Sequence, residues 1–146
     1  MNQILTNKTL IDLIKTLEDF FAKAPALPAN IREIIVKITP WLALVFGILG
    51  VLGGIGALGL SPMASVAGVD ASFMVLLAGI FSIIGSALML VAFPKLKEHK
   101  MDGWKLLFLS QVVGVISSVV SGAILGAVIG GLIGFYFLYQ IKSYYK

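Results

Sequence analysis

The residues best suited to chemistry lie in a basic segment past the middle of the chain. Glu98, His99 and Asp102 are close in sequence, and His99 is the only histidine. Because Glu98 and Asp102 are four residues apart, they would share one face of a helix, where a divalent metal ion could bind. The interleaved lysines favour the other interpretation, a solvated charged loop. The chain has no cysteine, which excludes disulfide bonds and thiolate metal sites.

The remaining polar groups form no catalytic constellation. Asp70 is expected to cap the second apolar segment rather than bind a ligand. Gln111 is expected to hydrogen-bond a neighbouring helix, and Gln140 to lie where water reaches it. The glycines fall inside apolar stretches, which excludes a phosphate-binding loop. We therefore expect no enzymatic activity, no cofactor and no bound metal.

The composition is that of a membrane protein. Of the 146 residues, 59% are hydrophobic and 12% are charged, about half the charged share of an ordinary soluble domain. The mean hydropathy of +1.03 excludes an ordinary cytosolic enzyme and a disordered tail. The net charge of +4 comes from basic residues that flank apolar segments. We therefore expect the partners of these residues to be membrane lipids with anionic headgroups. We do not expect the protein to bind nucleic acid.

The apolar segments have the lengths of membrane-spanning helices. Two uncharged segments are followed by Ser61-Pro62 and by Pro94, which we expect to end the first two spans. A third uncharged segment, residues 106–141, would be about 54 Å long as one helix, so we divide it near Ser121. The sequence predicts an all-α integral membrane protein with four transmembrane helices. Its predicted spans are residues 41–60, 72–93, 106–121 and 123–140.

The segment before the first span is predicted to be a separate unit. Residues 9–24 have apolar residues at helical spacing but too many charges to cross a bilayer, which predicts an amphipathic interfacial helix. Residues 1–30 are thus this helix and a proline-rich linker, and residues 31–146 form the membrane bundle. The helix rests either on lipid or on the bundle. Pro40 either starts the first span or kinks a longer helix.

The distribution of basic residues predicts the orientation. With four spans, five basic residues precede the first span, four separate the second and third, and two follow the fourth, so all lie on one side. The positive-inside rule then predicts a multi-pass protein of the inner (cytoplasmic) membrane with both termini in the cytoplasm. Aromatic residues at that side are expected to anchor the bundle among the headgroups: Trp41, Trp104, Tyr144 and Tyr145.

Glycine spacing is the most specific pattern in the spans. In the fourth span, glycines recur every fourth residue from Gly122 to Gly134, which allows close approach of another helix. In the first span, glycines recur every third residue and wrap around the helix. These glycines pack either the bundle of one chain or an interface with a second subunit. The predicted helix-packing residues are Gly47, Gly50, Gly54, Gly114, Gly122, Gly126, Gly130 and Gly134.

Several short motifs are spread over most of the chain. They are Pro25-Ala-Leu-Pro28 with Ile31-Arg32-Glu33, Pro40-Trp41 with the glycine-rich stretch to Gly59-Leu-Ser-Pro62, Gly103-Trp104, and Ile133-Gly134-Phe135-Tyr136 through Gln140-Ile-Lys-Ser-Tyr-Tyr145. In these motifs the chain resembles a group of small four-span membrane proteins found in many bacteria, especially minimal-genome candidate lineages. That group has no assigned activity, so the resemblance implies the topology and supplies no site residues.

Three functional hypotheses follow from these patterns. The first is a non-enzymatic structural or assembly protein that acts through glycine-mediated helix packing. The second is a small oligomeric channel or transporter subunit, although the spans contain no charged residue. The third is an enzyme that acts at the membrane surface through Glu98, His99 and Asp102. A homo-oligomer is the expected partner in the first two hypotheses.

Overall fold

A computed structural model describes residues 1–67 and 69–146, and the side chains of residues 2, 64, 67, 69 and 70 lie outside this description. The expected cap by the Asp70 side chain therefore lies outside the described residues. The helices are α1 (Asn2–Leu5), α2 (Lys8–Phe21), α3 (Ala29–Ala64), α4 (Val69–Lys97), α5 (Met101–Val120) and α6 (Ile124–Ile141). Short 3-10 turns, Ser65–Ala67 and Lys142–Tyr144, follow α3 and α6.

Four of these helices, α3 to α6, are long and apolar enough to cross a membrane. Helices suit this environment because each one satisfies its own backbone hydrogen bonds where water is absent. The described residues contain no strand. The predicted all-α membrane fold with four spans is therefore confirmed.

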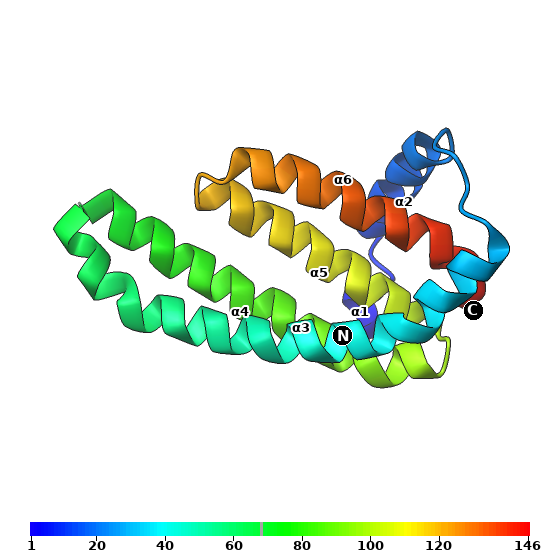
Figure 1. The fold of residues 1–146 in the computed structure, drawn as a ribbon, viewed down its shortest axis with the longest axis horizontal. Coiled ribbons are helices and arrows are strands. Elements are labelled where there is room, and N and C mark those ends of the chain that lie inside the picture. The colour runs from blue at the N-terminus through cyan, green and yellow to red at the C-terminus, as the bar shows by residue number, and fades with distance from the viewer. Residues whose placement is uncertain (68) are drawn as a thin grey trace.

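The four spanning helices form two antiparallel hairpins of unequal length (Figure 1). α3 and α4 make the longer hairpin and pack against each other extensively. α5 packs on α4, and α6 packs on α5, whereas α3 and α6 meet only locally. The turn between α3 and α4 projects well beyond the turn between α5 and α6 (Figure 1). The helices therefore form an open array rather than a closed bundle.

Three prolines lie inside helices, which corrects the expected ends of the first two spans. α3 continues through Pro40 and Pro62, and α4 continues through Pro94. A proline at one position leaves the carbonyl four residues earlier without its usual donor. At Pro62 that carbonyl belongs to Leu58, and the Ser61 hydroxyl donates a hydrogen bond to it at 2.9 Å. The first span therefore extends to Ala64 as part of one long helix that begins before Pro40.

The third and fourth spans are divided where the sequence predicted. α5 ends at Val120 and α6 begins at Ile124, with Gly122 between them at φ +77°. This left-handed backbone conformation favours glycine, which has no Cβ. α5 begins at Met101, five residues before the predicted start of the span at residue 106. Its first turn therefore carries charge and lies outside the apolar part of the helix.

The buried core lies at the charged end, which we define as the end that holds α1, α2, the α4–α5 connection and the C-terminus. Trp104 and Phe108 of α5 are completely buried there. Leu5 of α1 and Ile14 of α2 belong to the same cluster. The amphipathic helix α2 therefore rests on the bundle. Phe20, on the same helix, is 61% exposed and remains free to contact lipid.

Candidate functional site

An aromatic cluster joins α2 to the spanning helices at the charged end. We call it the docking cluster, and its members are Phe21, Trp104, Phe108, Phe135 and Tyr139. The ring of Phe21 stacks on Tyr139 with centroids 5.6 Å apart, and Tyr139 meets the edge of Trp104 at 5.7 Å. Phe108 contacts Phe135 at 5.2 Å. Aromatic pairs at these distances stabilise a contact beyond their buried area, so the cluster fixes α2 on α5 and α6.

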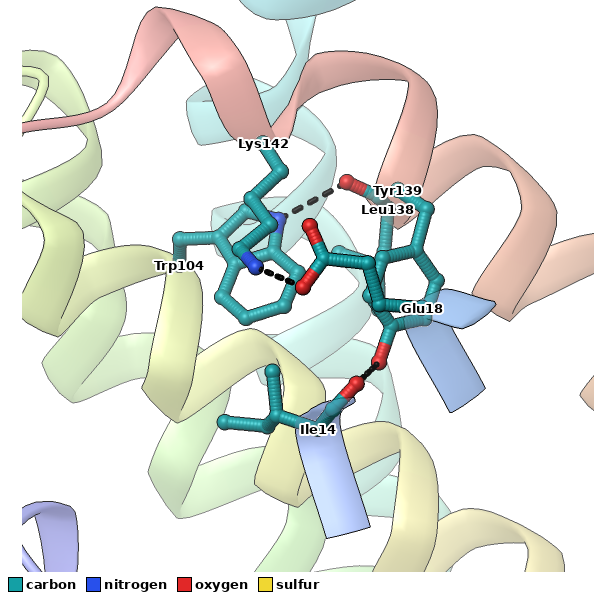
Figure 2. Close-up of polar contacts among 6 residues, drawn as sticks. All are labelled: Ile14, Glu18, Trp104, Leu138, Tyr139 and Lys142. Carbon is teal, nitrogen blue, oxygen red and sulfur yellow. Dashed lines mark hydrogen bonds and ion pairs between the residues drawn. The ribbon is translucent and has the colours of Figure 1, made fainter. Parts of the chain in front are cut away.

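Three polar contacts surround the docking cluster (Figure 2). The Trp104 indole N–H donates to the Leu138 carbonyl at 2.8 Å, and the Tyr139 hydroxyl donates to the Ile14 carbonyl at 2.7 Å. The Lys142 ammonium forms an ion pair with Glu18. Each contact joins segments that are far apart in sequence. The Trp104 bond satisfies a donor that would otherwise be buried without a partner, whereas the ion pair remains partly exposed.

The proline-rich linker is held by the last turns of α6. The Tyr136 hydroxyl donates to the Pro25 carbonyl at 2.7 Å, and the Gln140 side-chain N–H donates to the same carbonyl at 3.3 Å. The backbone N–H of Leu27 donates to Gln140 Oε1 at 3.0 Å. The carbonyl oxygen and the N–H group of the Gln140 side chain therefore both bind the linker to α6.

Two of the four predicted interface anchors are buried in protein instead. Trp104 has no exposed surface and Tyr145 is 2% exposed, so neither side chain reaches lipid headgroups. Burial raises the pKa of the Tyr145 phenol to about 12. Trp41 is 56% exposed and Tyr144 is half-buried. The anchor prediction is thus wrong for Trp104 and Tyr145 and remains a prediction for the other two.

The acidic and histidine residues of the α4–α5 connection point to no metal centre. Glu98 pairs with Lys100, and Asp102 lies 3.6 Å from Lys95. The Lys100 ammonium lowers the pKa of the Glu98 carboxyl, and Glu98 raises the pKa of Lys100. His99 has φ +53° and its ring faces Tyr145 at 5.9 Å. Within residues 1–67 and 69–146, no three His, Asp or Glu residues lie close enough together to hold a metal ion.

The glycines on one side of α3 allow α4 to approach closely. A Cβ at Gly54 would lie 2.9 Å from the Gly79 carbonyl oxygen, and one at Gly47 would lie 3.3 Å from the Ser86 carbonyl oxygen. The Ser82 hydroxyl donates to the Gly50 carbonyl at 3.1 Å. In lipid the hydrophobic effect does not drive helices together, because the acyl chains are as apolar as the side chains. Close packing of small residues and interhelical hydrogen bonds hold the helices together instead. Gly47, Gly50 and Gly54 therefore lie in the α3–α4 contact.

Most of the predicted packing glycines of α5 and α6 have no other helix packed against them. A Cβ at Gly114 or Gly130 would have no neighbour within 4 Å in the described part of the chain, and one at Gly126 would meet only Ala123. Gly122 lies in the turn. Gly134 alone of its stripe faces another helix, where the Gln111 side chain covers it.

Of the two predicted alternatives, packing inside one chain is not seen for Gly114, Gly122, Gly126 and Gly130 in the described residues, and an interface with a second subunit stays a prediction. Four-residue spacing identifies a face of a helix, but it does not say which way that face turns. The expected hydrogen bond of Gln111 is confirmed, since its side-chain N–H donates to the Gly130 carbonyl at 3.0 Å. This bond and the one from Trp104 to Leu138 both join α5 to α6.

A groove that the sequence analysis missed runs along α4 between α3 and α5. We call it the serine groove, after Ser82, Ser86, Ser110, Ser117 and Ser121. Two cavities of about 270 and 380 Å³ share Ser82 and Ser117 and form its two halves. The Ser110 hydroxyl is buried, with no hydrogen-bond partner among the described residues. Serines spaced four or seven residues apart on two predicted spans were the signal that could have indicated this groove.

The docking cluster was also missed, because its members lie on three separate helices. The signals available were two aromatic pairs at four-residue spacing, Trp104 with Phe108 and Phe135 with Tyr139. Such pairs share one face of a helix. No family model, curated protein or solved structure matches the chain. The function is therefore argued from the geometry of these surfaces.

Proposed function

We propose that the protein is a non-enzymatic integral membrane protein with a structural role, which self-associates through small-residue helix faces. One observation carries this proposal. Gly126 and Gly130 lie one helical turn apart on α6, and a Cβ at either position would meet no other helix in the described part of the chain, although the Gly130 carbonyl accepts the Gln111 hydrogen bond. Gly50 and Gly54 have the same spacing on α3 and are filled by α4. The face on α6 has the composition of a packing surface without a packing partner.

The physical reason for assembly is that glycines without a packed neighbour destabilise a helix and gain no contact energy to offset that cost. Glycine is less favourable than alanine in a helix interior by about 1 kcal/mol. Close approach of a second helix adds van der Waals contacts and Cα–H···O contacts that can offset this cost. The neighbouring large apolar side chains, Leu125 at 74% and Ile129 at 50% exposed, would form the rim of such a contact.

We also propose that the charged end faces the cytoplasm at the inner membrane. The three groups of basic residues lie at that end, where anionic headgroups would attract them. The docked helix α2 supports this arrangement, because its exposed Phe20 can enter the lipid while its charged residues face water.

The mass of the intact particle in lipid nanodiscs, measured by native mass spectrometry, tests the structural proposal. The wild-type chain should be an oligomer, and a Gly126→Leu, Gly130→Leu variant should be a monomer. Gly56 on α3 also has open space around it, so Gly56→Leu is a matched control that should remain oligomeric. A wild-type monomer would contradict self-association, and an oligomer that survives both α6 substitutions would contradict the assigned face.

A small oligomeric channel or transporter subunit is the second candidate function, and the serine groove favours it. Hydroxyl groups that line a groove at membrane depth could become pore-lining groups when several copies assemble. Purified protein in liposomes would then release an entrapped ion or dye above the rate of empty liposomes. The structural proposal predicts no such release from liposomes that contain the oligomer.

A further inference from the structure

A pocket of about 310 Å³ opens at the charged end, between the start of α3 and the end of α4. Its base consists of Val36, Pro40 and Leu96, which are all buried. Its walls come from three separate parts of the chain. They are Glu33, Lys37 and Trp41 of α3, Lys97 and His99 at the end of α4, and Tyr144 near the C-terminus.

Two lysines of this pocket have no acidic partner. Lys37 and Lys97 form no ion pair with any residue in the described ranges 1–67 and 69–146. The Lys97 ammonium lies 5.5 Å from the centroid of the Trp41 ring and 5.6 Å from that of Phe93. Cation–π contacts of this length hold the ammonium in place without neutralising it. The other ionisable groups at the pocket are the Glu33 carboxylate, the His99 imidazole and the Tyr144 phenol.

The pocket is layered in the same order as a lipid molecule. Lys37 lies one helical turn before Trp41, and Lys97 lies one turn after Phe93, so both lysines lie nearer the charged end than this aromatic pair. The rings of Trp41 and Phe93 meet edge to face at 5.8 Å. From these rings toward the α3–α4 turn, α3 carries no charged residue and α4 carries none until Asp70 near its start. A lipid likewise has its phosphate above its glycerol esters and its acyl chains below.

One wall of the pocket is fixed by the C-terminal residues. The backbone N–H of Lys146 donates to the His99 carbonyl at 2.9 Å, and the Met101 N–H donates to the Lys146 carbonyl at 2.7 Å. The ring contact between His99 and Tyr145 lies beside these bonds. A wall that is ordered before a ligand arrives loses little conformational entropy on binding.

We propose that this pocket binds the phosphate headgroup of an anionic membrane lipid. Lys37 and Lys97 contact the phosphate, and Trp41, which is 56% exposed, lies along the glycerol-ester region. Charge complementarity selects this occupant, because the two unpaired ammonium groups outnumber the single Glu33 carboxylate. The proposal rests on the membrane location of the protein and does not depend on its self-association.

Native mass spectrometry of the full-length protein, released from nanodiscs of phosphatidylglycerol and phosphatidylcholine, tests this site. The wild-type chain should retain phosphatidylglycerol in preference. Each lysine near anionic lipid contributes about 1 kcal/mol, so a Lys37→Gln, Lys97→Gln variant should bind phosphatidylglycerol roughly thirtyfold more weakly. Glu33→Gln should bind it more tightly, because a like charge is removed. Retention by the double variant at the wild-type level would overturn the proposal.

A matched control separates a specific site from general charge. Lys8 and Lys15 of α2 are exposed and form no ion pair in the described part of the chain. The Lys8→Gln, Lys15→Gln variant lowers the net charge equally. The control should retain phosphatidylglycerol, and an equal loss in both variants would contradict the pocket. If glycerol 3-phosphate at equal concentration displaced the bound phosphatidylglycerol, the assignment of a lipid as the occupant would be overturned. That result would indicate a site for a free phosphate compound. The same spectra report oligomer mass, so failure of self-association is seen separately.

Discussion

At the scale of single residues, Trp104 supplies a hydrogen-bond donor at the end of α6. The backbone N–H of Lys142 bonds to the Tyr139 carbonyl, one residue short of the usual α-helical partner. The Trp104 indole N–H donates to the Leu138 carbonyl instead. The last carbonyls of a helix need such donors when they are buried. Trp104 therefore completes α6 as well as filling the core.

Replacing Trp104 by phenylalanine should destabilise the protein by about 1–3 kcal/mol, because the Leu138 carbonyl loses its buried donor. Denaturation in detergent, followed by circular dichroism, measures this change. Trp41→Phe is the control, since Trp41 is largely exposed and its replacement should cost less than about 1 kcal/mol. Equal losses of stability in the two variants would show that the indole bond contributes nothing particular.

At the scale of elements, α2 is attached to the bundle by a small number of contacts. The stacking of Phe21 on Tyr139, the bond from Tyr139 to Ile14, and the ion pair between Glu18 and Lys142 all lie on one face of α2. The opposite face is exposed to the surroundings. An element attached in this way can open locally at a much lower free energy than the core.

Glu18→Gln should loosen α2 while leaving the spanning helices intact. The ion pair is half-exposed, so its loss should cost about 0.2–1 kcal/mol and raise hydrogen exchange in residues 8–21 up to about fivefold. Asp19 forms no ion pair among the described residues, which makes Asp19→Asn a control of equal charge change that should leave exchange unchanged. Equal exchange in the two variants would contradict a role for the ion pair in docking.

The unequal hairpins have a consequence for the membrane. The Ser117 hydroxyl donates to the Ala78 carbonyl at 3.3 Å, which fixes the register of α5 against α4. From this contact α4 continues to Val69, whereas α5 ends at Val120. At 1.5 Å per residue the end of α5 therefore lies about 9 Å short of the α4 start. Backbone in the α5–α6 turn cannot remain exposed to hydrocarbon, so the bilayer should thin around it.

Single cysteines test this thinning cleanly, because the chain has none of its own. Ser121→Cys in the shorter turn and Val66→Cys in the longer turn should both react with a membrane-impermeant maleimide added from the same side. Val66 is 92% exposed and serves as the reference. A Ser121→Cys variant that stays unlabelled while Val66→Cys reacts would place the shorter turn in dry hydrocarbon and contradict the thinning.

The sequence predicted the spans well and the faces of the helices poorly, for physical reasons. The spans could be predicted because the thickness of the bilayer sets the length of an uncharged segment that crosses it. The same thickness required the last uncharged segment to be divided near Gly122. Pro62 did not end α3, because the hydroxyl of the neighbouring Ser61 donates to the carbonyl that the proline leaves free. Trp104 has the residue type and sequence position of an interfacial anchor, yet it is buried in contact with Leu138 and Tyr139 of α6. Which neighbour covers a side chain depends on tertiary packing, which periodicity does not report.

At the scale of the whole molecule, the core and the surface are separated along the bundle. The docking cluster concentrates the buried residues at the charged end, while large apolar side chains of α3, α4 and α6 remain exposed over the rest. Lipid covers such surfaces without penalty, and small-residue faces among them favour helix contacts. Self-association through the α6 face is therefore the central claim for the molecule as a whole.

Counting copies in lipid tests that claim most directly. A single dye attached through Lys146→Cys, with photobleaching steps counted for isolated particles in a supported bilayer, gives the number of chains per particle. We predict two or more steps for this labelled chain and one step when Gly126→Leu and Gly130→Leu are added. Single-step bleaching of the labelled chain without the glycine substitutions, at full labelling, would contradict the proposed assembly.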